Sequence, residues 1–326
     1  MSAPVEVDGL DDGPLGRLAL SRSTVDRATQ RRGDNEWIEA AWADPRSRVI
    51  VVSNSQARIT EADGHPELVF VPPADAPEGT RFFLGLDADE VAYFGVSSAV
   101  EGEAWDRSTR SDVKPVSLRQ VGAILSDRDA GLLTHAVALA NWHQTHTHCP
   151  QCGAATVPAP AGHLTVCPVD GTEHFPRLDP AVIMLVIDAD DRLLLARNAL
   201  WPKGRMSVVA GFVEPGESAE HAVAREVFEE TAITVGQVRY LGSQPWPMPR
   251  SLMLGYQATA KSGQSIAVDQ DEIGEARFFS RAELRAAIDE GELGIAPSSS
   301  IARRLIEYWY GAELPEGPAG WGPPNR

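Results

Sequence analysis

Short apolar runs dominate the N-terminal part of the chain. Val, Ile, Phe and Tyr gather in four segments bounded by Pro, Gly and Asp: residues 48–53, 68–71, 81–87 and 91–97. Runs of this length and composition are typical of β-strands. The opening 35 residues are polar and are expected to be partly disordered, although residues 15–20 can dock. The pattern predicts a β-rich N-terminal domain.

The spacing of apolar residues becomes helical near Ser117. Residues 117–125 and 130–143 repeat apolar side chains every three or four positions, which predicts two helices. The second predicted helix has an apolar stripe made of Leu132, Leu133, Ala136, Val137 and Ala140. These helices lead into the segment that contains all three cysteines.

From residue 181 onward, strand-like and helical patterns alternate. The strand-like runs are residues 181–188, 192–197, 205–213, 238–241, 252–260 and 276–279. Helical spacing appears in residues 218–230, 281–289 and 298–310. We expect a mixed sheet with helices on its faces, so the fold class of the whole chain is α+β. The Pro and Gly content of residues 313–326 indicates a flexible tail.

Length and composition indicate a globular protein of two or three domains. The chain has 326 residues, of which 43% are hydrophobic and 23% charged. Neither a signal peptide nor a membrane-spanning run is visible, so no membrane partner is expected. Three cysteines are too few for a disulfide framework, which favours the cytoplasm. The net charge of −17 disfavours broad nucleic-acid binding but not recognition of one nucleotide or one RNA end.

Four glutamates stand on or just before the helix predicted at residues 218–230. Glu217 precedes it, and Glu226, Glu229 and Glu230 project from neighbouring positions opposite its apolar face. Carboxylates this close repel one another unless a cation lies among them, and hard oxygen ligands suit Mg²⁺ or Mn²⁺. A solvated acidic helix face is the simpler alternative. The density of acid instead favours a metal site that acts on a diphosphate.

This region resembles the signature box of the Nudix hydrolases. The residues in register are Gly211, Glu217, Arg225, Glu226, Val227, Glu229, Glu230 and Ile233. Ala232 departs from the pattern, because the family has glycine there. A left-handed residue after the helix would make alanine cost about 1 kcal/mol, so the departure bears on the turn and not on the metal chemistry. The resemblance implies an α/β/α sandwich with a mixed sheet, and catalysis by Glu217, Arg225, Glu226, Glu229 and Glu230.

A second motif, SQPWPMPRS in residues 243–251, is similar to the SQPWPFPxS motif of the NADH pyrophosphatases. Alternating prolines stiffen this loop, and Trp246 offers a flat face for stacking a base. Gln244 and Ser251 can hydrogen-bond a ribose, an amide or a phosphate. A stiff surface loop around a buried Trp is the alternative. The predicted substrate-binding residues in the motif are Gln244, Pro245, Trp246, Pro247, Met248, Pro249, Arg250 and Ser251.

The cysteine segment predicts a structural zinc site. Cys149 and Cys152 form one half of a zinc-binding knuckle, and Cys167 begins a second half in which Asp170 stands where a fourth cysteine is expected. A carboxylate can ligate zinc, so Cys₃Asp is chemically reasonable. His174 is the rival fourth ligand, and a third possibility is a site that has lost its metal.

The NADH pyrophosphatase resemblance covers most of the chain. It implies an N-terminal domain at residues 1–145, a zinc ribbon at 146–178, a Nudix domain at 179–312 and a tail at 313–326. It also implies substrate contacts at Arg119, Phe175, Phe212 and Ala302, and metal contacts at Ala210, Glu226, Glu229, Glu230 and Glu272. Plain core packing is the alternative for the two Phe residues. A homodimer is implied as well, with Trp309 and Tyr310 as candidate surface residues.

The leading hypothesis is a Mg²⁺- or Mn²⁺-dependent enzyme that cleaves NADH or NAD⁺ into nicotinamide mononucleotide and AMP, with NAD-capped RNA as a related substrate. A broader hydrolase of ADP-ribose or dinucleoside polyphosphates is the alternative within the same class. A non-catalytic nucleotide sensor is the alternative from another class, and the departures at Ala232, Met248 and Asp170 are its only support.

Overall fold

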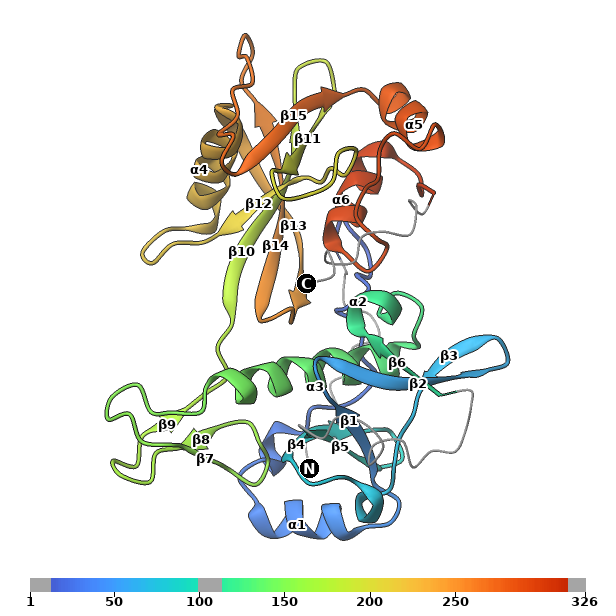
Figure 1. Ribbon diagram of the computed structural model, residues 1–326, viewed down its shortest axis with the longest axis vertical. Helices are drawn as coiled ribbons and strands as arrows, with labels where there is room; N and C mark the ends of the chain where they lie inside the picture. The colour runs from blue at the N-terminus through green and yellow to red at the C-terminus, as the bar shows by residue number, and fades with distance from the viewer. Residues whose placement is uncertain (1–12, 99–112, 316–326) are drawn as a thin grey trace. The chain divides into compact units, whose positions relative to one another are not determined.

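The computed structural model describes residues 13–98 and 113–315, which divide into two compact units (Figure 1). The first unit holds residues 20–178 together with Pro245–Arg250, and the second holds residues 13–19, 179–244 and 251–315. The division at residue 178 separates the cysteine segment from the acidic helix.

Three small sheets and three helices build the first unit. Their bounds are α1 Asn35–Ala43, β1 Arg48–Val52, β2 Gln56–Ala62, β3 His65–Leu68, β4 Thr80–Leu86, β5 Ala92–Ser97, β6 Lys114–Ser117, α2 Leu118–Val121, α3 Asp127–Thr145, β7 Val157–Pro158, β8 Thr165–Val166 and β9 Glu173–His174. The sheets have the strand orders β1-β5-β4, β3-β2-β6 and β7-β8-β9. Two 3₁₀ turns complete the unit, at Thr29–Arg31 and Pro73–Asp75.

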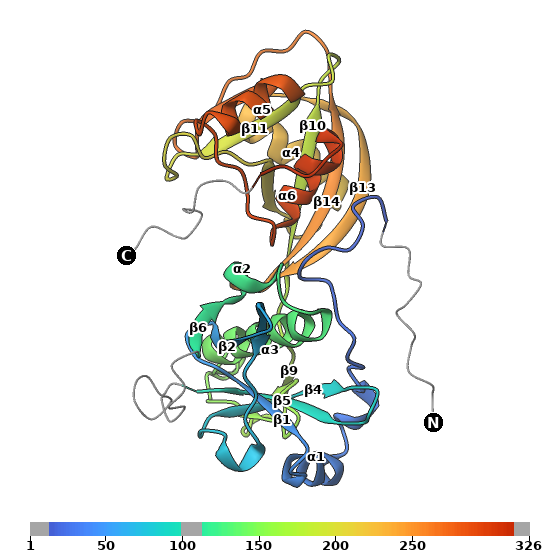
Figure 2. The ribbon, with the colours of Figure 1, turned by 90° about the vertical axis from the view of Figure 1, so that its right-hand side faces the viewer.

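Helices cover both faces of the β1-β5-β4 sheet (Figure 2). Ile50 and Leu84 pack with α3 in one apolar cluster, whereas Val49 and Phe83 pack with Ile38 of α1 in another. Because neighbouring residues of a strand point to opposite faces, both faces of this sheet are buried. The β-rich N-terminal domain is confirmed, with α1, β2 and β6 as elements that the sequence patterns did not predict. The strand predicted at residues 68–71 was misplaced, since β3 covers His65–Leu68.

The second unit is a mixed six-stranded sheet between helices. Its elements are β10 Asp179–Ile187, β11 Leu193–Asn198, β12 Val209–Phe212, α4 Ala219–Thr231, β13 Val235–Trp246, β14 Ser251–Ala260, β15 Ile273–Phe279, α5 Arg281–Asp289 and α6 Ile301–Tyr310. The strand order is β13-β14-β10-β11-β15, and β12 pairs with β10. β10 is parallel to β14 and antiparallel to β12.

Alternate residues of β10 face the two helical layers of this sandwich (Figure 1). Val182 and Met184 pack in the cluster that includes the apolar face of α4. Ile183 and Leu185 pack in the cluster that includes α5 and α6. The expected α/β/α sandwich is therefore confirmed, and α4 is the helix predicted to carry the glutamates.

Four expectations need correction. Residues 205–208 are not strand, since only Val209–Phe212 pairs along β10. The strand predicted at 238–241 extends over Val235–Trp246. Trp309 is 4% exposed and packs in the core, so it is not a surface residue. Leu314 is also buried, and its carbonyl accepts a hydrogen bond from Arg303, so the tail is not loose at residue 314. The remaining tail residues, 316–326, lie outside the described residues.

No helix in the described ranges combines the length and the apolar character needed to cross a membrane.

Candidate active site

The helix α4 begins and ends at well-defined caps. The Ser218 hydroxyl accepts a hydrogen bond from the His221 backbone N–H at its start. At its end Ala232 adopts the left-handed conformation, with φ 57° and ψ 16°, and its N–H donates to the Phe228 carbonyl at 2.7 Å. The chain therefore keeps the turn for which the family uses glycine, and alanine bears the steric cost.

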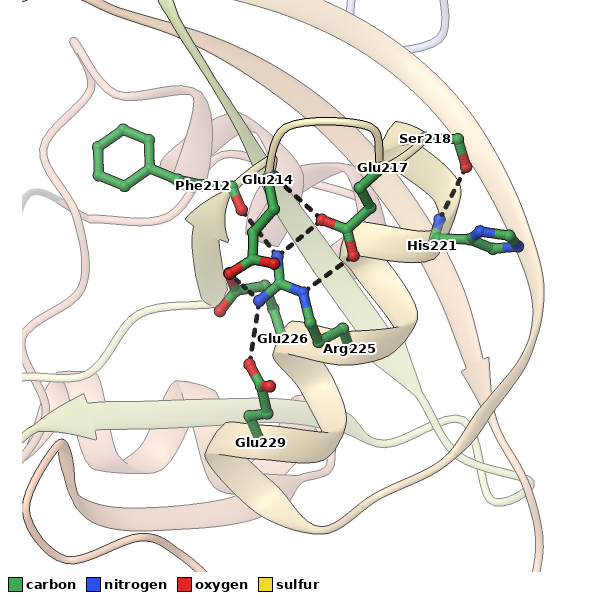
Figure 3. Close-up of polar contacts among 8 residues, drawn as sticks. All are labelled: Phe212, Glu214, Glu217, Ser218, His221, Arg225, Glu226 and Glu229. Atoms are coloured by element: carbon green, nitrogen blue, oxygen red, sulfur yellow. Dashed lines mark hydrogen bonds and ion pairs between the residues drawn. The ribbon is translucent and has the colours of Figure 1, made fainter.

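Arg225 lies at the centre of the carboxylates (Figure 3). Its guanidinium donates two hydrogen bonds of 2.9 Å to Glu217, one of 2.8 Å to Glu226 and one of 3.0 Å to Glu229. A further bond of 2.8 Å goes to the backbone carbonyl of Phe212. Arg225 thus fixes the side chains of three glutamates and ties α4 to β12.

The positive charge of Arg225 balances the negative charge of Glu217. The paired hydrogen bonds from Arg225, helped by the Glu214 backbone N–H, lower the pKa of Glu217 to about 2. Its carboxylate is therefore ionised throughout the neutral range while both of its oxygens are occupied by donors. This geometry suits a residue that holds Arg225 in place.

Glu230 is in the opposite situation. It is only 6% exposed, and burial, followed by the negative charges of Glu226 and Glu272, raises its pKa to about 8. Within the described part of the chain, no Lys or Arg forms an ion pair with Glu230. Burial likewise raises the pKa of Glu226. A buried carboxylate without a counter-cation, beside two other acids, fits a divalent cation with oxygen ligands.

Gly211 makes room for the Glu226 carboxylate. A Cβ atom at position 211 would lie 1.9 Å from the carboxyl carbon of Glu226, far inside van der Waals contact. Gly211 pairs with Val182 in the sheet, and Ala210 pairs with Ile183. The first glycine of the box is thus required by a close approach of α4 to β12, and not by an unusual backbone angle.

Among the described residues, the predicted metal-site glutamates do not form a group of ligand atoms as close as that of the cysteine segment, but two of them act on Glu230. The carboxylates of Glu226 and Glu272 both lie near enough to Glu230 to raise its pKa. Glu229 is the exception among the acids, since its side chain is 56% exposed and turned to Arg225. Ala210 is exposed and lies next to Gly211 on β12.

The predicted substrate residues of the second unit differ in accessibility. Phe212 is 58% exposed and offers a free ring face, whereas Ala302 is buried on α6.

Gln244 is fully buried, and its amide donates to the Ser299 carbonyl at 3.1 Å. Gln244 therefore holds the end of β13 in this arrangement and does not offer its amide to a ligand. Ser251, the first residue of β14, pairs with Asp179 of β10.

The proline loop Pro245–Arg250 belongs to the first unit. Trp246 and Met248 pack against the apolar cluster of that unit, and the guanidinium carbon of Arg119 lies 5.4 Å from the Trp246 ring centroid. Burial lowers the pKa of Arg119, which nevertheless stays charged at neutral pH. The structure thus brings Arg119 and the loop together. Phe175, on the same unit, is 62% exposed.

The sequence patterns missed Asn141, which contacts the loop, and Ser55, which contacts Asn141. The side-chain amide of Asn141 donates to the carbonyls of Pro247 and Pro249, and its oxygen accepts from the Ser55 hydroxyl. Neither residue belongs to a motif, and Asn141 interrupts the apolar stripe of α3. A polar residue on an otherwise buried helix face is the one signal that could have identified it.

The cysteine segment folds into two similar turns. In each, the first cysteine accepts a backbone hydrogen bond of 2.9 Å from a glycine four residues on: Gly153 to Cys149 and Gly171 to Cys167. The ligand atoms of Cys149, Cys152, Cys167 and Asp170 all lie within 4.8 Å of one another. Three thiols and a carboxylate at this spacing fit zinc.

Asp170 lies within this group, whereas His174 does not. Hydrogen bonds from Thr172 hold the pKa of Asp170 well below its usual range, so the carboxylate is ionised and ready to ligate. His174 lies on β9, opposite Thr165, and outside the group of four. The geometry therefore favours Asp170 as the fourth ligand.

Comparison with known protein families matches three stretches of the chain. Residues 177–298 match the NUDIX domain, residues 144–175 match the NADH pyrophosphatase zinc ribbon domain, and residues 45–142 match the NADH pyrophosphatase-like rudimentary NUDIX domain. The NAD-capped RNA hydrolase NudC of Mycobacterium bovis (strain BCG / Pasteur 1173P2) is 42% identical over 316 residues, which cover 94% of this chain and 99% of that protein.

A human relative is more distant but still aligns over most of the chain. The NAD-capped RNA hydrolase NUDT12 of Homo sapiens is 32% identical over 336 residues, which cover 89% of this chain and 72% of that protein. The matched residues include the acidic box, the proline loop and the cysteine turns. The chain therefore belongs to the NADH pyrophosphatase family of the Nudix hydrolases.

Proposed function

We propose that the protein hydrolyses the diphosphate bond of NADH and NAD⁺ to give AMP and the corresponding mononucleotide, and that it also removes NAD caps from RNA 5′ ends. The buried, uncompensated carboxylate of Glu230 beside Glu226 and Glu272 carries the proposal, because it suits a divalent cation that holds a diphosphate. The names of the relatives support NAD-capped RNA as the substrate class.

Glu226, Glu230 and Glu272 would hold Mg²⁺ or Mn²⁺, with Glu229 and the carbonyl of Ala210 as further ligands. Bound there, the cation neutralises the diphosphate and lowers the pKa of a water molecule. Arg225 keeps Glu226 and Glu229 in fixed rotamers through its hydrogen bonds. Glu229 and Glu230 are the two candidates for the general base, and Glu229 is the one that solvent reaches, so it can accept a proton from water.

Product analysis tests this function directly. Liquid chromatography of NADH incubated with the protein should show AMP and reduced nicotinamide mononucleotide with Mn²⁺, and neither product after chelation. Glu230→Gln should lower kcat by at least about a hundredfold, because it removes a buried metal ligand. Glu220→Gln, on the exposed start of the same helix, is the matched control and should turn over normally.

The alternatives give different results in the same assay. Similar kcat/KM for ADP-ribose and NADH would indicate the broader hydrolase. Tight NADH binding without products would indicate a nucleotide sensor. Near-normal turnover by Glu230→Gln would rule out the assignment of the metal site.

We further propose one structural zinc ion per chain, held by Cys149, Cys152, Cys167 and Asp170. The protein would act as a homodimer in the cytoplasm, where free thiols are stable. Metal analysis of Cys152→Ser and light scattering of the intact protein test the two proposals.

A further inference from the structure

The backbone of the proline loop has few N–H groups with which to hold its own shape. Pro245, Pro247 and Pro249 have no N–H group, so every second residue of Pro245–Arg250 lacks a donor. The Met248 N–H donates to the Trp246 carbonyl at 2.7 Å. The carbonyls of Pro247, which is buried, and of Pro249, which is exposed, take donors from outside the loop backbone, and the buried one in particular needs a partner.

Asn141 supplies those donors from α3. Its side-chain nitrogen lies 2.7 Å from the Pro247 carbonyl oxygen and 3.3 Å from that of Pro249. Asn141 is 9% exposed, so water competes little for these bonds. Two carbonyl acceptors on one side also fix the orientation of the amide, because its NH₂ group and not its oxygen must face them.

Ser55 fixes the other end of the amide. The Ser55 hydroxyl donates to the Asn141 side-chain oxygen at 2.7 Å. Ser55 lies in the two-residue turn between β1 and β2, where Asn54 and Ser55 both have positive φ and Ser53 and Gln56 exchange backbone hydrogen bonds. This is the geometry of a tight hairpin turn, which holds the hydroxyl on a rigid support. All the polar groups of the Asn141 side chain are thus used to hold the loop.

We propose that Asn141 is a positioning residue for substrate selection, whose amide fixes the shape of Pro245–Arg250 and thereby the placement of Trp246 and Met248. Asn141 and the loop both belong to the first unit. This inference rests on the proposed function of the loop. Asn141 itself needs no contact with the substrate.

Replacement of Asn141 by leucine tests the proposal, because leucine has a similar size but no amide. Asn141→Leu should raise KM for NADH about tenfold, equivalent to about 1.4 kcal/mol, and change kcat by less than about threefold. Hydrogen exchange of the peptide that contains Met248 should become faster. Ser55→Ala, which keeps the amide but removes its orienting donor, should show the same changes to a smaller extent.

Thr134→Val is the matched control. Thr134 is buried on the same helix, and its hydroxyl donates to the Ala130 carbonyl without touching the loop. This variant should lose stability to a similar degree but keep the wild-type KM and loop exchange. Equal KM changes in Asn141→Leu and Thr134→Val, or an unchanged KM in Asn141→Leu, would overturn the proposal.

The outcome for the proposed function is separate. Absence of NADH turnover in the wild-type protein would contradict the proposed function. The dissociation constant for NADH, measured by protein fluorescence, and the exchange of the loop would then decide the role of Asn141. Unchanged exchange in Asn141→Leu would overturn it.

Discussion

The acidic helix and the proline loop are held in place by different means. In α4 the charged groups fix one another, because Arg225 reaches Glu217, Glu226 and Glu229, all within a short stretch of sequence. The proline loop is held by Asn141, which is more than a hundred residues away along the chain. The first arrangement is local and electrostatic, whereas the second depends on tertiary packing. Chemistry and substrate choice are therefore expected to fail independently when each is disturbed.

The strongest disturbance of the acidic helix that leaves every charge in place is Gly211→Ala. Because the new methyl group would lie where the Glu226 carboxylate now sits, that side chain must move. We expect kcat to fall about a hundredfold with little change in the fold, as measured by steady-state kinetics and circular dichroism. Gly236→Ala is the control, since a Cβ there meets nothing closer than 3.8 Å. A normal kcat for Gly211→Ala would show that the position of Glu226 is not critical.

A disturbance of the loop should affect binding and not chemistry. Trp246→Ala removes the flat ring proposed to stack on a base, and such a contact contributes about 1–3 kcal/mol. KM for NADH should rise about tenfold or more, while kcat changes little. The comparison between the two regions would fail if Trp246→Ala lowered kcat as strongly as Gly211→Ala.

The pH dependence of metal binding gives a further test of the electrostatic arrangement on α4. Without metal the pKa of Glu230 is about 8, mainly because it is buried. The cation binds the ionised carboxylate, so below this pH binding must release a proton, and Mn²⁺ affinity should fall by up to about tenfold per pH unit. Titration calorimetry in buffers of different ionisation enthalpy measures this proton. Glu230→Gln should reduce the release to what Glu226 contributes, since burial raises the pKa of Glu226 as well.

The raised pKa of Glu230 also predicts how the stability of the metal-free protein changes with pH. The folded state keeps Glu230 protonated up to about pH 8, whereas the unfolded chain ionises it near the ordinary pKa of 4.5. The unfolded state therefore binds fewer protons between these values, and this contribution to the free energy of unfolding falls as pH rises through the window. Denaturant unfolding of wild type and Glu230→Gln at pH 5 and pH 8 measures the contribution of Glu230 to the free energy of unfolding.

The smallest expected effect concerns the turn that ends α4. Ala232→Gly should raise the free energy of unfolding by about 1 kcal/mol, because glycine adopts the left-handed conformation without the steric cost. Catalysis should be unaffected, since the helix already ends at this turn. Denaturant unfolding at constant pH measures the change, and a destabilised variant would contradict this reading of the turn.

The sequence predicted the local arrangement well and the tertiary one poorly, for physical reasons. Helical spacing placed Glu226 and Glu230 on α4 because periodicity is a property of a single segment. The expectation that Glu230 projects opposite the apolar face was wrong, because the structure buries it beside Val223 and Val227. Gln244 was expected to contact substrate, but it is buried against Ser299, a residue just before α6 that only the tertiary fold brings to β13. Asn141 and Ser55 lie far from any motif, and only the fold brings them to the loop. Trp309 illustrates the same limit, since an aromatic residue near a chain end is buried by packing that spacing alone does not reveal.

Asp170 in place of a fourth cysteine has a consequence for oxidative damage. Four thiols in such a cluster can be consumed as two disulfides, but the three present here can form only one. A reduced thiol then always remains within 4.8 Å of the other ligand atoms, close enough to attack the new bond by thiol–disulfide exchange. An oxidised cluster can therefore rearrange among its three cysteines and stays open to repair by cellular thiols.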